Sequence, residues 1–95
     1  MKLVIQIPCF NEENNIGKLL EDIPEKIEGI DKIEIIVLDD CSADNTVKKA
    51  QDYNVRIITS KKRAGLSNIF KIGVEHALSS NADILVNIDG DNQYC

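Results

Sequence analysis

Polar residues follow three apolar runs of the sequence, at the points where those runs end. They occupy residues 8–13 (Pro-Cys-Phe-Asn-Glu-Glu), 39–42 (Asp-Asp-Cys-Ser) and 89–93 (Asp-Gly-Asp-Asn-Gln). Each group alone fits an ordinary strand-to-helix turn, because Asp, Asn and Ser are common helix caps. Three such groups at equivalent places indicate a shared ligand site, provided that the fold brings the ends of the runs together.

Asp89 and Asp91 are spaced so that their carboxylates can share a cation. Gly90 between them gives the backbone freedom to turn both side chains toward one point. Mg²⁺ and Mn²⁺ take oxygen ligands and commonly complete their shell with water and substrate phosphates, and Gln93 can add a carbonyl oxygen. The motif predicts a Mg²⁺ or Mn²⁺ site that holds a diphosphate; the alternative is an Asx turn without metal.

Asp39 and Asp40 offer carboxylates to the N–H groups of a nucleotide base or to ribose hydroxyls. Adjacent residues point in different directions, so one contacts the ligand while the other supports the turn. We assign the ligand contact to Asp40 and the supporting role to Asp39, and the reverse assignment stays open. The basic run 61–63 follows the next apolar run, and Arg63 is the member best suited to contact a diphosphate; a solvated loop is the alternative.

Short apolar runs rich in β-branched residues alternate with segments of helical spacing, which is the pattern of an α/β protein. The predicted strands are 3–7, 33–38, 55–58 and 84–88. Apolar residues at helical spacing lie between them: Ile16, Leu19, Leu20 and Ile23; Val47 and Ala50; Leu66, Phe70, Gly73, Val74, Ala77 and Leu78. Right-handed crossovers would make the four strands parallel, with helices on both faces. The prediction is a Rossmann-like parallel four-stranded sheet whose carboxyl ends, and the three polar groups, share one edge.

Size and composition fit one globular domain over residues 1–95, with 43% apolar and 28% charged residues. The net charge of −5 argues against a nucleic-acid partner or an anionic membrane surface. Three cysteines without CxxC spacing fit a reducing compartment, so we expect a cytoplasmic protein. Residues 1–9 are too short and too polar for a signal segment or a membrane span, and we expect a buried strand there.

The chain resembles family 2 glycosyltransferases in four motifs, in order and in spacing. They are Ile-Pro-Cys-Phe-Asn-Glu-Glu at 7–13, Val-Leu-Asp-Asp-Cys-Ser-Ala-Asp-Asn-Thr at 37–46, Gly-Leu-Ser at 65–67 and Asn-Ile-Asp-Gly-Asp-Asn-Gln-Tyr at 87–94. The DxDxQ form is most similar to the polyprenyl-phosphate mannosyl- and glucosyltransferase branch. The resemblance implies the nucleotide-binding half of a GT-A fold.

The resemblance also implies roles for particular residues. A nucleotide-sugar pocket would be formed by Pro8, Phe10, Glu12, Leu38, Asp40, Arg63, Asp89 and Gly90. Within it, Leu38 and Asp40 would hold base and ribose, while Asp89, Asp91 and Gln93 would hold the metal and the diphosphate. Three positions depart from the family, which commonly has Tyr at 10 and Gly at 41 and 45. Asn45 tolerates a left-handed backbone better than Cys41 does, so we expect the turn after Asp40 to differ from that of the family.

The activity implied by the resemblance is transfer of a sugar from a UDP- or GDP-linked donor to a polyprenyl phosphate or a glycan. The reaction would invert the anomeric centre and depend on metal. In the resembled family, acceptor-binding residues follow the DxD strand, so we expect residues 1–95 to be a truncated catalytic domain that is inactive alone, with its general base beyond Cys95. The whole protein is expected in the cytoplasm or at the cytoplasmic face of a membrane. Strand 84–88 at a sheet edge would permit self-association.

Two other classes of protein remain as alternatives. A phospho-acceptor signalling domain is also a doubly wound sheet with acids at strand ends, but its acidic pair would follow the first strand rather than the second. A non-catalytic module that binds nucleotide sugars would carry the same motifs as those found here. A dinucleotide-binding oxidoreductase is disfavoured because no GxGxxG follows the first strand.

Overall fold

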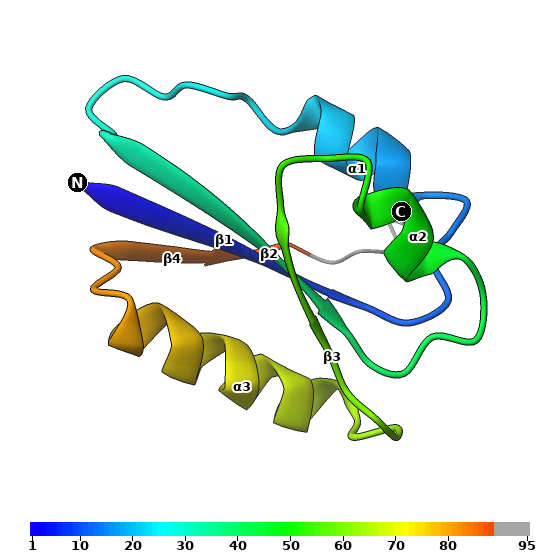
Figure 1. Cartoon of the computed structure of the whole chain (residues 1–95). Coiled ribbons are helices and arrows are strands. Elements are labelled where there is room, and N and C mark those ends of the chain that lie inside the picture. Colours follow the sequence, from blue (N-terminus) through cyan, green and yellow to red (C-terminus); the bar gives the residue numbers. More distant parts are fainter. Residues whose placement is uncertain (89–95) are drawn as a thin grey trace, which may run out of the picture.

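The computed structural model describes residues 1–88, apart from the side chain of Leu66, and shows strands alternating with helices along the chain (Figure 1). Seven elements follow in order: β1 (Lys2–Cys9), α1 (Ile16–Asp22), β2 (Lys32–Asp39), α2 (Thr46–Ala50), β3 (Arg56–Thr59), α3 (Leu66–Ser79) and β4 (Ile84–Asn87). All four predicted strands are present, and none of their bounds is shifted by more than two residues.

The strands form one parallel sheet in the order β3-β2-β1-β4. The register pairs Cys9 with Asp39 and Asp39 with Thr59, so three strands end side by side. On the other side of β1, Gln6 pairs with Asn87 near the end of β4. The predicted parallel sheet, and the shared edge formed by its carboxyl ends, are confirmed for the described residues.

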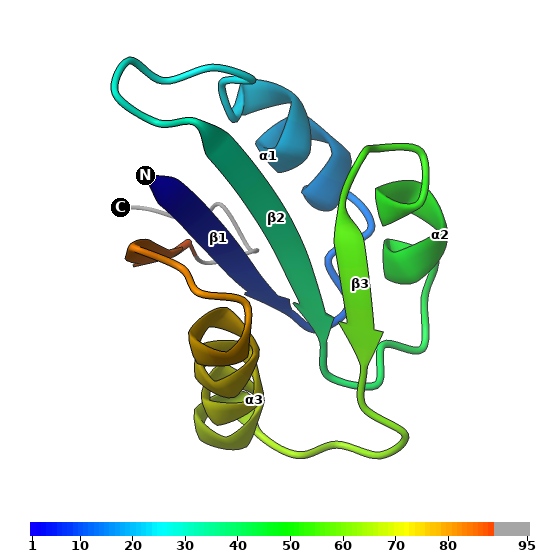
Figure 2. The same ribbon diagram turned by 60° about the vertical axis from the view of Figure 1, so that its left-hand side comes forward.

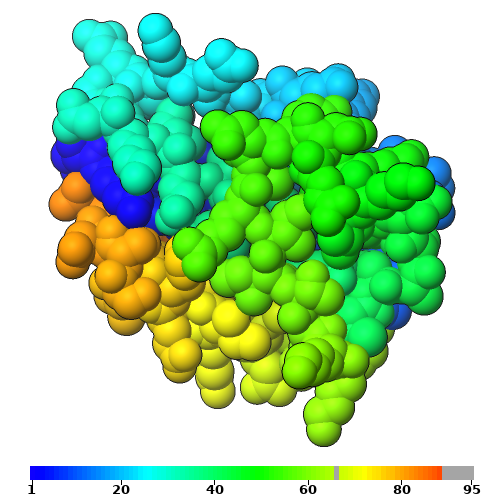
Figure 3. Space-filling view, viewed as in Figure 1, coloured from blue at the N-terminus to red at the C-terminus, as the bar shows by residue number. Residues whose placement is uncertain are grey.

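Helices cover both faces of the sheet, with α1 and α2 on one face and α3 on the other (Figure 2). Alternate residues of the central strands serve the two faces, as the two-residue period of a strand requires. Leu3, Ile5, Ile7 and Cys9 pack toward α1, and Val4 packs toward α3. Most of β1 is hidden behind later segments in the space-filling view (Figure 3).

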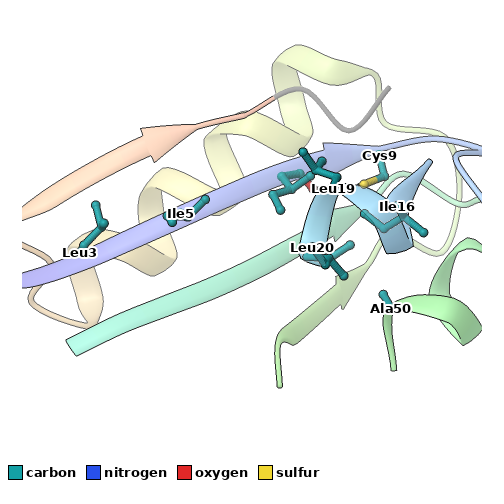
Figure 4. Close-up of a cluster of buried hydrophobic side chains, with 9 residues drawn as sticks. Leu3, Ile5, Cys9, Ile16, Leu19, Leu20 and Ala50 are labelled. Atoms are coloured by element: carbon teal, nitrogen blue, oxygen red, sulfur yellow. Dashed lines mark hydrogen bonds between the residues drawn. The ribbon is translucent and has the colours of Figure 1, made fainter. Parts of the chain in front are cut away.

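The core under α1 begins at the carboxyl end of β1. Ile16, Leu19 and Leu20 of α1 lie close to Cys9, and Ala50 adds a contact from α2 (Figure 4). Helix α1 ends at Asp22 because Ile23 is extended, the conformation that Pro24 imposes on the residue before it. This packing fixes the start of α1 directly after the polar group 8–13.

The face of α3 that packs on the sheet is narrower than the predicted apolar face, and it is rotated around the helix axis relative to that face. Ile69, Gly73 and Ala77, spaced four residues apart, are its buried residues. Phe70 and Leu78, which share the helical spacing in the sequence, are 42% and 73% exposed. The predicted apolar set included Gly73 and Ala77 but not Ile69, and it also included Phe70 and Leu78, which are exposed.

Strand β4 lies at an edge of the sheet formed by the described residues, as predicted for the last strand. Self-association through this edge stays a prediction. Within residues 1–88, no helix combines the length and the apolar character needed to cross a membrane.

Candidate functional site

The loops that follow β1, β2 and β3 are joined at the carboxyl edge by main-chain hydrogen bonds. Asp40 N–H donates to the Cys9 carbonyl at 2.9 Å, and Ser60 N–H donates to the Asp39 carbonyl at 2.9 Å. These bonds continue the sheet ladder beyond the strand ends. The polar groups 8–13 and 39–42 and the basic run 61–63 are therefore neighbours in space, as the sequence predicts.

Asp40 is fully buried and accepts hydrogen bonds from three consecutive residues of the β3–α3 loop. Its carboxylate accepts from Arg63 Nε at 3.0 Å, from Ala64 N–H at 2.7 Å and from Gly65 N–H at 3.1 Å. Burial raises the pKa of this carboxyl, but hydrogen bonds from the three donors outweigh it and hold the pKa below its ordinary value. Asp40 is thus an ionised anchor for the loop that carries Arg63.

Arg63 and Phe10 are in direct contact. The guanidinium carbon of Arg63 lies 3.5 Å from the centre of the Phe10 ring, which is a cation–π geometry. The Arg63 side chain is 51% exposed, and only its Nε is bonded to Asp40. Asp40, Arg63 and Phe10 together form what we call the Asp40 cluster, with a charged and an aromatic surface available to a ligand.

The side chain of Asp39 makes only local hydrogen bonds. Its carboxylate accepts from the Ser42 hydroxyl and from Ser42 N–H, and the side chain is buried. This matches the supporting role assigned to it. Contact of Asp40 with a nucleotide base stays a prediction, since three donors already occupy part of its accepting capacity.

Side-chain hydrogen bonds join the loop after β1 to the loop after β2, and the sequence did not predict them. Asn11 N–H donates to Ser42 Oγ at 2.9 Å, and Ala43 N–H donates to Asn11 Oδ1 at 2.8 Å. A second pair of bonds runs from Glu12 N–H to Thr46 Oγ1 at 2.8 Å and from Glu13 N–H to Asp44 Oδ2 at 3.2 Å. The two motifs are therefore held as one rigid unit.

Asp44 connects this unit to the start of α2. Its Oδ1 accepts from Thr46 N–H at 3.0 Å and from the Thr46 hydroxyl. Burial raises the pKa of Asp44, and hydrogen bonds from Thr46 and Glu13 lower it further than burial raises it, so the net shift is downward. An Asp two residues before a Thr at a helix start is the signal in the sequence that could have identified this bond.

Positions 41 and 45, where the family commonly has Gly, were expected to differ in backbone conformation, with Asn45 the better suited to a left-handed one. The structure shows the reverse. Cys41 itself adopts the left-handed conformation, with φ of 62°. Asn45 has φ of −89° and is an ordinary residue before α2. The Cys41 turn therefore adopts a conformation that favours Gly without having one, because Asp39 and Asp40 on its N-terminal side are both held by hydrogen bonds.

The remaining predicted pocket residues differ in how accessible they are. Pro8 and Glu12 are half-buried, and the Glu12 carboxylate accepts from Asn15 Nδ2 at 3.2 Å. Leu38 is fully buried in the core with Ile36 and Ile69, so a role for its side chain in holding a nucleotide is not supported by the structure. Its burial between sheet and α3 explains why an apolar residue stands there.

Cys9 is buried in the core on the α1 side, where burial raises the pKa of its thiol to about 12. A thiol with this pKa is not a nucleophile at neutral pH. Among the described residues, Cys9 and Cys41 are free cysteines, and the reducing compartment stays a prediction.

The predicted metal residues Asp89, Asp91 and Gln93, and Gly90 between the two acids, lie outside the described residues. Within residues 1–88 no group of three or more His, Cys, Asp or Glu side chains is arranged to hold a metal ion. The chain approaches Asp89 through Ile88, whose N–H donates to the Gln6 carbonyl at 2.9 Å. Asp89 therefore follows directly on the strand that pairs with β1.

Known proteins share this sequence pattern and this fold. Residues 4–94 match the family model described as Glycosyl transferase family 2. The chain is 36% identical over 98 residues to a dolichol-phosphate mannosyltransferase of Pyrococcus furiosus, and the match covers 99% of this chain and 27% of that protein. The chain thus spans less than a third of the length of this relative.

Solved structures of glycosyltransferases have the same arrangement of elements. A mannosyltransferase from Pyrobaculum calidifontis, solved with GDP-Man and Mn²⁺, is 25% identical with a TM-score of 0.79; the match covers 94% of this chain and 27% of that one. Glucosyl-3-phosphoglycerate synthase from Mycobacterium tuberculosis, solved with Mn²⁺, UDP and glucosyl-3-phosphoglycerate, is 26% identical with a TM-score of 0.73 over 94% and 33% of the two chains. The motifs, the parallel sheet and the family match agree, and the chain belongs to glycosyl transferase family 2.

Proposed function

We propose that this chain binds the nucleoside diphosphate of a sugar donor at the carboxyl edge of its sheet and serves a glycosyltransferase. The observation that carries the proposal is the Asp40 cluster, in which a buried carboxylate fixes Arg63 over Phe10. It stands at the place where parallel α/β sheets bind ligands, beside the strand that leads into the DxD motif.

Each member of the cluster has a distinct task in this proposal. The Phe10 ring and the guanidinium plane offer stacking surfaces to a base, while exposed N–H groups of Arg63 donate to anionic or carbonyl oxygens. Asp40 keeps the guanidinium in place; one lone pair of its carboxylate is left for a base N–H, but the side chain is fully buried, so this contact would require the β3–α3 loop to move. The cross-linked loops after β1 and β2 hold the wall of the site rigid.

Asp89 and Asp91, with Gln93, are the residues proposed to hold Mg²⁺ or Mn²⁺ against the donor diphosphate. The ion would stabilise the negative charge that develops on the leaving diphosphate. Two observations support this proposal: Asp89 follows Ile88 in the sequence, which is bonded to β1, and two structurally similar proteins were solved with Mn²⁺.

The reaction proposed for the whole protein is an inverting displacement at the anomeric carbon. An oxygen of the acceptor would form the new bond as the bond to the diphosphate breaks. The name of the Pyrococcus relative favours a polyprenyl phosphate as the acceptor, and an acceptor of that kind would bring the protein to the cytoplasmic face of a membrane. Because the chain spans 27% of that relative, acceptor choice and transfer are proposed for the whole protein only.

The test of the nucleotide site is calorimetric titration of UDP and GDP into the chain and into Arg63→Ala. We expect the affinity of the preferred nucleotide to fall about 10-fold, which corresponds to roughly 1.4 kcal/mol, the order of one cation–π or charge-assisted contact. Lys62→Ala is the matched control, since it removes the same charge from an exposed neighbour. Equal affinities for Arg63→Ala and the parent chain would contradict the proposed site.

A further inference from the structure

A pocket of about 600 Å³ lies beside the amino-terminal half of β2, on the sheet face that α1 covers. It is lined by Ile33 and Ile35 of β2, by Ile23 directly after α1, and by Tyr53 and Val55 before β3. This volume is in the range of ligand pockets. The polar loops of the candidate nucleotide site follow the carboxyl end of β2, so the pocket lies at the opposite end of that strand.

The pocket exists because α1 is too short to cover β2. The seven residues of α1 make a helix about 10 Å long, whereas the eight residues of β2 span about 26 Å. Pro24 keeps the chain extended at Ile23 and prevents a longer helix. On this face of β2, Val37 is therefore fully buried, while Ile33 and Ile35 are only half-buried.

The polar side chains that line the pocket are mainly hydrogen-bond acceptors. Glu21 and Glu25 contribute exposed carboxylates from the side of α1. The Tyr53 hydroxyl donates its hydrogen to Glu21 Oε1 at 2.8 Å, so its oxygen is left as an acceptor. Among the lining side chains, only Asn54 has further N–H groups to donate. The pocket thus fits a ligand with an apolar part and a cationic donor.

The acidic surface extends beyond the pocket itself. Residues 21–28 contain four acids and one basic residue, Lys26, and the acids Asp22 and Glu28 are exposed like the two that line the pocket. A small cationic molecule would reach only part of this charge, and the half-buried isoleucines would leave it largely in solvent, unlike most small-molecule sites. A polypeptide segment can cover the pocket and place basic side chains along the acidic surface.

We propose that this pocket is a docking site for a basic segment of a protein partner. One large apolar side chain of the partner would contact Ile33 and Ile35, and neighbouring Lys or Arg side chains would lie beside Glu21 and Glu25. Burial of the apolar side chain would supply most of the affinity, while the exposed ion pairs select the sign of the charge. The inference goes beyond the proposed nucleotide site and does not depend on it.

NMR titration of the chain with three acetylated and amidated peptides tests the docking site. The peptides are Lys-Lys-Leu-Lys-Lys, Lys-Lys-Ser-Lys-Lys and Glu-Glu-Leu-Glu-Glu. We expect the first to cause saturable shift changes at the methyl groups of Ile33, Ile35 and Val55. The Ser peptide should bind at least about 10-fold more weakly because it lacks the apolar contact, and the Glu peptide should cause no saturable change. No saturable change with the Leu peptide, or equal binding of either control peptide, would overturn the proposal.

Glu25→Lys and Glu75→Lys are matched variants, because both reverse one exposed charge and Glu75 lies on α3 over the other face of the sheet. Glu25→Lys should bind the Leu peptide about 5-fold more weakly, since an exposed attraction becomes a repulsion. Glu75→Lys should change this affinity by less than about 2-fold, because salt screens distant charges. Equal affinities of the two variants would contradict the proposed contact with Glu25.

Two further titrations separate a partner segment from other occupants of the pocket. Hexylammonium has an apolar chain and one cationic group, and we expect it to bind more weakly than the Leu peptide. Binding of hexylammonium as tight as that of the peptide would show a small-molecule site and overturn the proposal. Dilution of the chain alone should leave the methyl shifts of Ile33, Ile35 and Val55 unchanged; concentration-dependent shifts there would show that a second copy occupies the pocket, and would also overturn it.

Discussion

Asp40 accepts three hydrogen bonds from the β3–α3 loop while its side chain is fully buried. At this residue, the stability of the fold and the geometry of the site depend on the same contacts. The charge is retained in the interior because Arg63 and two main-chain N–H groups compensate its desolvation. A neutral amide would keep one oxygen and turn an NH₂ group toward donors.

Asp40→Asn should therefore destabilise the fold by about 2 kcal/mol, the order expected for loss of hydrogen bonds to a buried charge. Urea unfolding followed by circular dichroism measures this difference. Asp52→Asn is the matched control, because Asp52 is exposed and such surface substitutions usually change stability by less than about 0.5 kcal/mol. Similar midpoints for the two variants would show that Asp40 is not an anchor.

The lowered pKa values of Asp40 and Asp44 predict how stability depends on pH. A carboxyl whose pKa is lower in the folded state stabilises that state above its unfolded pKa, which is about 3.9. This contribution is lost as pH falls through the lowered folded pKa. We expect the urea midpoint to fall below about pH 4 and to fall less steeply in Asp44→Asn. A slope unchanged in Asp44→Asn would contradict the contribution assigned to Asp44.

At the scale of elements, the turn after β2 places a non-glycine residue, Cys41, in a left-handed backbone conformation that favours Gly. Cys41 adopts φ of 62°, whereas Asn45 at the start of α2 does not adopt a positive φ. Left-handed backbone costs a non-glycine residue roughly 1–2 kcal/mol, which exceeds the entropy that Gly loses on folding. The two positions should thus respond oppositely to the same substitution.

Cys41→Gly should stabilise the fold by roughly 0.5–1 kcal/mol, because relief of strain is partly offset by the flexibility of Gly in the unfolded chain. Asn45→Gly should be neutral or destabilising by up to about 1 kcal/mol. Thermal unfolding of both variants measures the contrast. Stabilisation by Asn45→Gly, or destabilisation by Cys41→Gly, would contradict the description of this turn.

The sequence was informative about elements and less so about their contacts. Continuous β-branched runs identified the four strands and their burial on both faces, since these properties are local. The face of α3 was predicted only in part, through Gly73 and Ala77, because apolar residues occur around the helix and the close approach of Gly73 to Gln6 depends on tertiary packing. The order β3-β2-β1-β4 also follows from contacts between distant segments rather than from local sequence.

For the candidate site, the sequence predicted the residues but not the contacts between them. Arg63, Phe10 and Asp40 were each singled out, and the structure brings them together. Their mutual bonding was not foreseen, because Asp40 and Arg63 are 23 residues apart and the loop between β3 and α3 has no regular pattern. Leu38 was assigned to the pocket by resemblance alone, and its side chain lies in the core.

At the scale of the molecule, the described residues would provide one wall of the proposed site. The carboxyl ends of β1, β2 and β3, the cross-linked loops and the Asp40 cluster lie together at one edge of the sheet, and the DxD motif follows β4 in the sequence. The carboxylates of Asp89 and Asp91 in the proposed DxD motif would repel a diphosphate in the absence of a cation. A divalent metal between the acidic motif and the diphosphate would remove that electrostatic conflict.

Metal-dependent binding of a nucleotide sugar is therefore the central claim, and calorimetry measures it directly. UDP, GDP, UDP-glucose and GDP-mannose would be titrated into the chain with Mn²⁺ or with EDTA, beside Asp91→Ala. The prediction is that one nucleotide and its sugar bind with Mn²⁺, and that EDTA and Asp91→Ala each abolish most of this affinity. Binding of equal strength in Mn²⁺ and in EDTA, or in the parent chain and in Asp91→Ala, would contradict the claim.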